Sequence, residues 1–391
     1  MKATRLPTSV RKRSPLLVAL AAAALVVVVV GTASAAGSVR DLFPGTTKGS
    51  RIAFTSFRNG SFDLYVMNAD GSKQRRLTTP AFGFPPPAWS PDGRRIAFVS
   101  GPGACILNIH RVNFVSERYV GTRDVDISVA NADGSGLRRL TRGPGVDCAP
   151  VWSPDGQKIA FQRLLVRGEG DKIVGFDFDV YVINADGSEE RNLTGDALGE
   201  RPIWSPDGRK IAFRSGPDGN GWVYVMNADG SERRMLARNH GLVAWSPDGR
   251  KILLVRGGAQ GPPATKAYAV VANADGSGLR TLTRIAGANG ALANWSPDGR
   301  KIVFVSDRDG NLEIYVVNAD GSGQRNLTRH PGHDSDPEWS PDGRKIAFAT
   351  KREGNFEIYV MNADGSGQHN PTRNPAVDRN PVWSPGRKQG S

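Results

Sequence analysis

Short runs of apolar and alternating residues, separated by turn residues, recur from residue 51 almost to the end of the chain. The clearest unit covers residues 337–372, where runs at Trp339, Ile346 and Tyr359 are each followed by a turn and a fourth run ends near Thr372. The runs are rich in β-branched and aromatic residues, as strands are. The turns contain Pro, Asp, Asn and Gly, which supply the φ values and local hydrogen bonds that tight turns need. The pattern therefore predicts four short β-strands in each unit.

Two motifs show that this unit is repeated. The pentapeptide NADGS begins at Asn68, Asn131, Asn184, Asn227, Asn273, Asn318 and Asn362. The tripeptide WSP begins at Trp89, Trp152, Trp204, Trp245, Trp295, Trp339 and Trp383. Successive tryptophans lie 63, 52, 41, 50, 44 and 44 residues apart, and a period near 44 with insertions is typical of a propeller blade. The sequence thus predicts an all-β, seven-bladed β-propeller.

The first and last units are incomplete in complementary ways. The unit at residues 51–78 has no Trp strand before it, and the Trp strand at Trp383 has no Ile strand after it. We therefore expect residues 379–386 to form the innermost strand beside residues 51–78. This pairing would close the ring and remove its free strand edges.

The N-terminus has the features of an export signal. Residues 1–13 contain five basic residues and no acid, Leu16 to Val30 are an uninterrupted apolar run, and small residues follow, with a cleavage site after Ala35. Residues 1–35 are predicted to be a cleaved signal peptide or an uncleaved signal anchor, with residues 16–37 in the membrane. Both alternatives export the rest of the chain. We assign residues 36–50 to a linker, 51–386 to the propeller and 387–391 to a tail.

Charge and composition limit the functional classes. The 391 residues include 51 Lys and Arg against 38 Asp and Glu, a net charge of +13. Five of these charges lie in residues 1–13, and many others follow the SPDG turns in pairs such as Arg344-Lys345. Such pairs would form a basic ring on one face, which is either simply solvated or meets anionic lipid or cell-wall polymer. Nucleic acid is not an expected partner of an exported protein.

The unit WSPDGRKIAF…EIYVMNADGSGQRNLT resembles the repeat of TolB-like β-propellers, relatives of WD-type repeats, over residues 51–386. The resemblance implies the propeller fold, an extracytoplasmic setting and a surface that binds a protein or ligand. It does not imply the specific role of TolB, because residues 36–50 are too few for the domain that precedes the TolB propeller. The family pattern also has six blades, whereas the motifs here count seven.

In the WD-like strand order, the SPDG and NADG turns project from one face and the remaining loops from the other. Nearly all length variation falls in those remaining loops, at residues 101–124, 165–177, 256–266 and 284–292. We expect this variable face to be the binding face, since loops on a rigid scaffold often carry function; neutral loop drift is the alternative. Cys105 and Cys148 both fall on it and are predicted to form a disulfide, with two free thiols as the alternative.

Candidate site residues lie in the loops that enter the innermost strands. Asp147, Asp334 and Asp378 share the pattern Asp-x-x-Pro-x-Trp, and His240 occupies the same position in another unit. These residues, with Asp336, are predicted at the channel mouth as a cation site or a receptor for a basic peptide. The structural alternative is that each Asp binds backbone N–H groups of its own turn.

The sequence contains one candidate metal site and no catalytic motif. His330 and His333 crowd one loop with Asp334 and Asp336, and three such ligands could hold a divalent metal. NADGS lacks the spacing of a calcium loop, and no GxSxG nucleophile elbow is present.

We therefore predict a monomeric, non-enzymatic, secreted, periplasmic or membrane-anchored bacterial propeller without a cofactor. Its partner would be a protein, a peptide or an envelope polymer. The alternative is a metal-dependent polysaccharide lyase or hydrolase of the propeller type.

Overall fold

A computed structural model describes nine segments of the chain: residues 50–78, 86–101, 124–143, 145–169, 172–195, 199–216, 221–257, 266–286 and 293–386. All regular structure in these segments is β-strand, which confirms the all-β prediction. Within these segments no helix has the length and apolar character needed to cross a bilayer. The apolar run at residues 16–30, the predicted tail at 387–391 and Cys105 lie outside the described residues.

The strands form antiparallel sheets that follow one another along the chain. The first contains β27 (Asp378–Trp383), β1 (Arg51–Ser56), β2 (Asp63–Asn68) and β3 (Arg75–Arg76). The next, eight-stranded, contains β4 (Ala88–Trp89), β5 (Arg95–Ser100), β6 (Asp124–Asn131), β7 (Arg138–Arg139), β8 (Gly145–Trp152), β9 (Lys158–Glu169), β10 (Lys172–Asn184) and β11 (Arg191–Asn192). It divides into the groups β4–β7 and β8–β11, which are joined only by a short parallel pairing of β6 with β8.

The remaining strands form four more sheets. One contains β12 (Glu200–Trp204), β13 (Lys210–Ser215), β14 (Trp222–Asn227) and β15 (Arg234–Ala237). Another contains β16 (His240–Trp245), β17 (Lys251–Arg256), β18 (Ala267–Asn273) and β19 (Arg280–Ile285). The last two contain β20 (Ala293–Trp295), β21 (Lys301–Ser306), β22 (Glu313–Asn318) and β23 (Arg325–Asn326), and β24 (Asp334–Trp339), β25 (Lys345–Thr350) and β26 (Glu357–Asn362).

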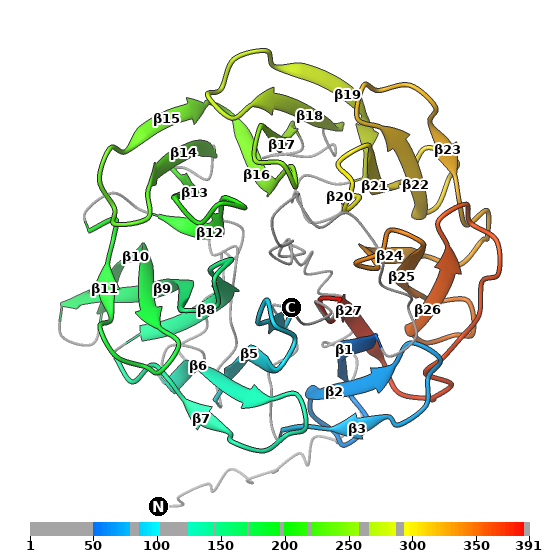
Figure 1. The fold of residues 1–391 in the computed structure, drawn as a ribbon, viewed down its shortest axis with the longest axis horizontal. Helices are drawn as coiled ribbons and strands as arrows, with labels where there is room; N and C mark the ends of the chain where they lie inside the picture. Colours follow the sequence, from blue (N-terminus) through cyan, green and yellow to red (C-terminus); the bar gives the residue numbers. More distant parts are fainter. Residues whose placement is uncertain are drawn as a thin grey trace, which may run out of the picture.

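The sheets stand around a central opening, with the first and last strands, β1 and β27, side by side (Figure 1). The expected pairing of the two ends is observed, because β27 is antiparallel to β1 and places Trp383 opposite Ile52. The Trp strands contact one another in the order β27, β4, β8, β12, β16, β20, β24 and again β27. These strands therefore surround the opening.

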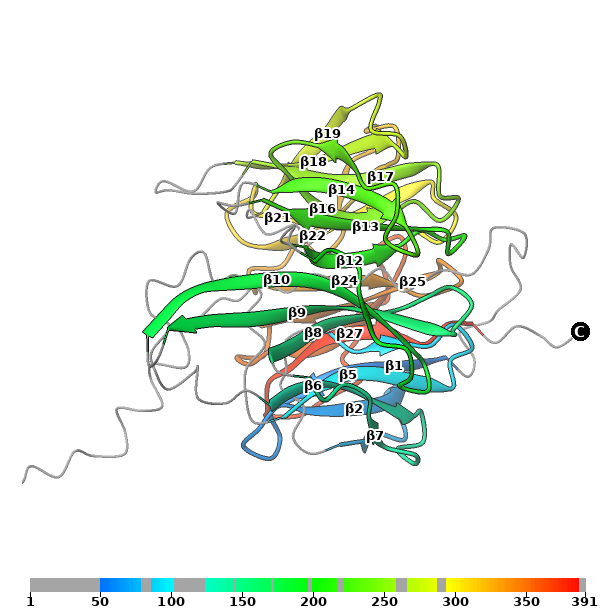
Figure 2. The ribbon, with the colours of Figure 1, turned by 90° about the vertical axis from the view of Figure 1, so that its left-hand side faces the viewer.

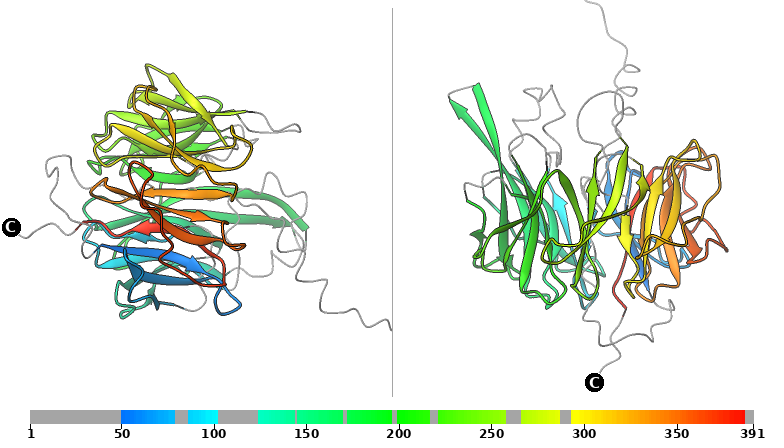
Figure 3. Two further views of the ribbon diagram at one scale, coloured as in Figure 1. Left: turned by 90° about the vertical axis from the view of Figure 1, so that its right-hand side faces the viewer. Right: turned by 90° about the horizontal axis from the view of Figure 1, so that it is seen from above.

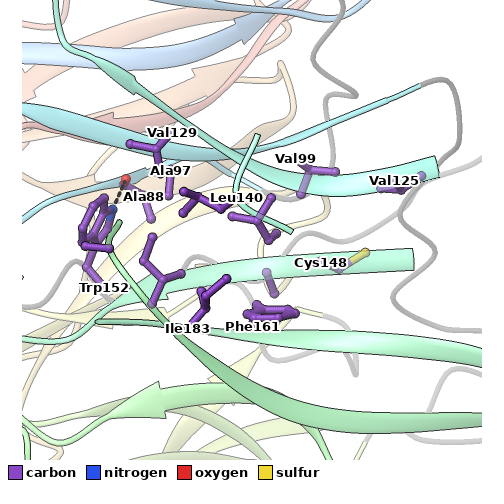
Figure 4. Packing of buried hydrophobic residues seen from close by; sticks show 14 residues of the cluster. Ala88, Ala97, Val99, Val125, Val129, Leu140, Cys148, Trp152, Phe161 and Ile183 are labelled. Carbon is purple, nitrogen blue, oxygen red and sulfur yellow. Dashed lines mark hydrogen bonds between the residues drawn. The ribbon is translucent and has the colours of Figure 1, made fainter. Parts of the chain in front are cut away.

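Apolar side chains fill the space between neighbouring sheets. One cluster joins Ile52 and Phe54 of β1 to Ile358 of β26, and another joins Val129 of β6 to Phe161 of β9. Figure 4 shows the second cluster, in which Trp152 lies beside Ala88 of the preceding group. Burying large side chains of this kind stabilises each by about 1.5–3 kcal/mol, so the contacts between sheets hold the ring together.

The tryptophan of the WSP motif adds a hydrogen bond between neighbouring groups. Trp152 Nε1 donates to the Ala88 carbonyl at 3.0 Å, and Trp89 Nε1 donates to the Val382 carbonyl at 3.1 Å. Trp204, Trp245 and Trp383 make the same bond to the group that precedes each of them. The motif is therefore a joint between sheets as well as part of a strand.

Candidate functional site

The SPDG and NADG turns use most of their polar groups internally. In the SPDG turn, Asp342 accepts hydrogen bonds from the Ser340 hydroxyl at 2.6 Å and the Arg344 backbone N–H at 3.1 Å. In the NADG turn, Asp364 accepts two bonds from Ser366, and these bonds hold the pKa of its carboxyl below the usual value. Gly365 has a φ of 87°, which favours glycine at this position. We call the face that bears these turns the repeat-turn face.

The opposite face, which we call the variable face, bears the remaining loops. The two strands β9 and β10 continue well beyond the ring on this side (Figures 2 and 3). Their antiparallel pairing extends from Lys158 opposite Asn184 to Glu169 opposite Lys172. The two faces therefore differ in shape as the sequence predicts.

The three acids of the Asp-x-x-Pro-x-Trp pattern lie at the variable end of their strands, but their side chains are buried within the sheets. Asp334 and Asp378 are fully buried, and Asp147 is 1% exposed. Each is paired with an arginine: Asp147 with Arg163, Asp334 with Arg352 and Asp378 with Arg58. The partner is thus a guanidinium group, not the N–H groups of the acid's own turn.

The three pairs share an aromatic ring beside the guanidinium group but differ in the number of bonds that join it to the acid. Arg163 donates from Nε and Nη2 to both carboxylate oxygens of Asp147, at 2.6 and 2.9 Å. Arg58 Nη2 donates to Asp378 at 2.9 Å, and its Cζ lies 4.9 Å from the Tyr65 ring centroid. Guanidinium groups at such distances are attracted to the ring face.

Burial and the ion pair act in opposite directions on these carboxyls. Burial raises the pKa of Asp147 and of Asp378, and the bonds from Arg163 and Arg58 oppose this rise. Removing one member of such a pair would leave the other charge buried. The geometry therefore assigns these acids a structural role, and the predicted cation or peptide site would have to break an existing ion pair.

Asp336 is the candidate acid nearest the protein surface. It has a φ of 53°, and its carboxylate lies 3.3 Å from Arg379 Nε of β27. Arg379 in turn lies over the Phe356 ring at 4.2 Å. Asp336 therefore links neighbouring sheets.

The loop with His330 and His333 does not gather a metal-ligand set. His330 Nδ1 accepts a bond from the Gly332 N–H, and both nearby acids are paired with arginines. In the part of the chain that the structure describes, no group of three or more His, Cys, Asp or Glu side chains could hold a metal ion. The metal prediction for His330 and His333 thus gains no support from the geometry.

His240 begins β16, and its Nδ1 lies 2.6 Å from the Arg238 carbonyl oxygen. Burial lowers the pKa of this imidazole, and the charge of Arg256 lowers it further. Cys148 is buried among apolar side chains (Figure 4). It is also disulfide-bonded. Cys105, the other cysteine of the chain, lies outside the described residues, and its pairing with Cys148 therefore stays a prediction.

One polar pair at the central opening was missed from the sequence. Asn294 of β20 donates to the Glu338 carboxyl of β24 at 2.5 Å, and burial raises the pKa of Glu338 to about 8. Both residues immediately precede a tryptophan of the WSP motif. The other groups have apolar residues at this position, so the polar side chains of Asn294 and Glu338 were a signal in the sequence. The apolar residues are Ala88, Val151, Ile203, Ala244 and Val382.

A second missed feature lies on the variable face of the sheets β12–β15 and β16–β19. In the other groups, the strand after the Ile strand has an acid opposite the residue four positions after that Ile. These acids are Asp63, Asp126, Asp179, Glu313 and Glu357. In these two sheets the residue at this position is Trp222 or Tyr268, as the pairings with Ser215 and Arg256 establish. Arg238 lies over Trp222 at 5.9 Å, and Arg256 lies over Tyr268 at 5.7 Å.

Comparisons with known proteins agree with the repeat pattern. Residues 243–389 match the family described as TolB beta propeller domain. The chain is 36% identical over 136 residues to a protein TolB homolog of Chlorobium luteolum, and 34% identical over 138 residues to the Tol-Pal system protein TolB of Bordetella pertussis. Each match covers 29% of this chain and 31% or 32% of the relative, so the chain spans about a third of the length of these relatives.

A solved structure extends the likeness of fold. An oligogalacturonate lyase in complex with manganese matches with a TM-score of 0.60 and 16% identity, over 83% of this chain and 89% of the lyase. At that identity the match shows a common fold and nothing about chemistry.

Proposed function

We propose that this TolB-like β-propeller repeat protein is an exported, non-enzymatic binding protein that recognises a protein, a peptide or an envelope polymer through its variable face. Residues 51–386 would form seven blades in a closed ring. Two observations support that architecture: β27 pairs with β1, and the Trp strands contact one another around the opening. The TolB relatives support an extracytoplasmic location, with residues 1–35 as the export signal and 16–37 as the anchor if it is not cleaved.

The difference between the two faces carries the proposal. The repeat-turn face presents copies of the same two turns, whose Asp, Ser and Asn side chains bond within the turn. At the variable face, strands are joined by segments that differ in length in the sequence, and the strands β9 and β10 project from it. Recognition needs a surface that differs from place to place, which favours the variable face.

Site-specific photocrosslinking in the producing bacterium tests this assignment. Lys351 follows β25 on the variable face and Arg344 follows an SPDG turn on the other, and both are exposed residues of one sheet. A photoreactive amino acid at position 351 should give covalent adducts, and the same residue at position 344 should give none. Adducts from position 344 alone would contradict the proposal.

The lyase or hydrolase alternative rests on fold likeness alone. Metal analysis of the purified full-length protein separates it from the binding function. Stoichiometric metal that is lost on His330→Ala and His333→Ala would favour the alternative. Unchanged metal content in the two variants would leave those histidines without that role.

A further inference from the structure

We propose that the variable face of the sheets β12–β15 and β16–β19 binds an acidic peptide segment of a protein partner. The anchoring groups would be Arg238, stacked on Trp222, and Arg256, stacked on Tyr268. This inference rests on the proposed function and names the chemistry of the partner.

The arginines of this surface differ from Arg58, Arg163 and Arg352 in having no acid partner among the described residues. Arg58, Arg163 and Arg352 also lie over aromatic rings, but each is paired with a buried aspartate. Arg238 and Arg256 are exposed, and among the described residues no carboxylate lies within ion-pair distance of either. Their guanidinium groups are therefore held against a ring while their donors remain available to an external carboxylate.

The two stacks lie at adjoining corners of neighbouring sheets. His240 donates its backbone N–H to the carbonyl of Gly221, the residue before Trp222, at 2.8 Å. His240 is also directly opposite Arg256 in the pairing of β16 with β17, and Arg256 is opposite Tyr268. The contact of His240 with both sheets places the two arginines on one continuous part of the variable face.

The surrounding charge is favourable to an anion. Arg214 lies on the side of its sheet that faces β16–β19, since Ala212, two residues away on the same strand, packs against that sheet. Residues 257–265 and 285–292, which flank the surface in the sequence, contain no acidic residue, and residues 216–221, which also flank it, contain one, Asp218. Glu200 and Asp307, the nearby acids of known position, are paired with Arg214 and Arg284.

The chemistry favours an acidic peptide over a sugar polymer. A sugar ring commonly stacks on an open aromatic face, but a guanidinium group already covers one face of each ring here. A planar guanidinium group binds a carboxylate through two parallel hydrogen bonds. Asp and Glu side chains on a flexible peptide can reach both arginines, whereas fixed spacing along a polymer is more restrictive.

Binding of a fluorescein-labelled octapeptide of alternating Asp and Glu to the full-length protein tests the proposal by anisotropy. The variant Arg238→Gln/Arg256→Gln should weaken binding about tenfold or more. The matched control, Arg209→Gln/Arg250→Gln, removes two exposed arginines of the same two sheets from the repeat-turn face and should change Kd less than about twofold. Arg238→Lys/Arg256→Lys keeps the charge and should give an intermediate loss.

Three results would overturn the proposal. One is failure of the wild-type protein to bind the acidic peptide better than an Asn/Gln peptide of the same length. The second is equal loss in the control variant, which would show a general charge effect. The third is binding of polygalacturonate or phosphatidylglycerol vesicles, in place of the peptide, that depends on Arg238 and Arg256. If photocrosslinking at position 351 still yields adducts in any of these cases, the proposed function stands and only this inference fails.

Discussion

Glu338 beside the central opening should make the protein less stable as the pH rises. Its carboxyl has a pKa of about 8, raised from 4.5 by burial, and one hydrogen bond from Asn294 only partly offsets that effect. The folded state therefore binds this proton more tightly than the unfolded chain does. The resulting stabilisation is complete below the unfolded pKa and is lost between about pH 4.5 and pH 8.

The magnitude follows from the two pKa values. One pKa unit corresponds to about 1.4 kcal/mol, so titration near 8 in place of 4.5 costs up to about 5 kcal/mol above pH 8. Glu338 is only partly shielded from solvent, and the remaining exposure to water will reduce this cost. We expect the substitution Glu338→Gln, which keeps the shape and cannot ionise, to stabilise the protein by about 2–3 kcal/mol at pH 9.

Urea denaturation followed by tryptophan fluorescence, repeated from pH 4 to pH 9, measures this effect. Wild type and Glu338→Gln should have nearly equal free energies of unfolding at pH 4 and should diverge as the pH rises. The control Glu232→Gln, at an exposed site on the repeat-turn face, should follow the wild type throughout. A stability difference that is the same at every pH would refute the reasoning.

Three further predictions concern the joints of the ring. Asp378→Asn should lower the free energy of unfolding, measured in urea, by about 3 kcal/mol, because Arg58 loses its buried partner. Asp307→Asn, in the exposed pair with Arg284, should lower it by less than about 1 kcal/mol, and equal costs would contradict the structural role of Asp378. Trp89→Phe should lower the free energy of unfolding by about 1 kcal/mol more than Trp295→Phe, since Trp89 Nε1 donates to the Val382 carbonyl and Trp295 Nε1 has no partner among the described residues. Calorimetric melting of the two variants measures the difference, and a larger loss for Trp295→Phe would be inconsistent with this reasoning. Thiol titration in denaturant should find no free thiol before reduction and two afterwards, and free thiols in the unreduced protein would rule out the Cys105–Cys148 bond. Cys148→Ser should lower the free energy of unfolding by about 2–4 kcal/mol.

Much of the fold was predictable because each strand is next to a turn with a fixed chemistry. The tryptophan and the NADG turn locate the strands, and the two incomplete units indicate that the ends of the chain pair. The ion pairs were harder to predict, because Asp378 and Arg58 are 320 residues apart in the sequence. A signal did exist for two of the pairs: Arg58 and Arg352 each lie two residues before a glycine in the loop after the Ile strand.

The candidate site was predicted less well than the fold. Asp147, Asp334 and Asp378 can be assigned from the sequence to the ends of the innermost strands, but the sequence could not show that their side chains turn into the sheet. The loops before Trp222 and Tyr268 differ in length, so the sequence does not show which residues lie opposite these two aromatic side chains. Their positions became known from the pairing of Trp222 with Ser215 and of Tyr268 with Arg256.

The pairing of β1 with β27 has a consequence for the order of folding. While the chain is being made or exported from its N-terminus, β1 is complete long before the partner strand that ends at Trp383 exists. For that interval one edge of β1 exposes unpaired backbone groups, and such edges invite intermolecular pairing. The contact also joins the most distant parts of the sequence, which makes it slow to form. The ring is therefore most vulnerable to aggregation before its last strand arrives, and a chaperone or rapid completion of the chain would protect it.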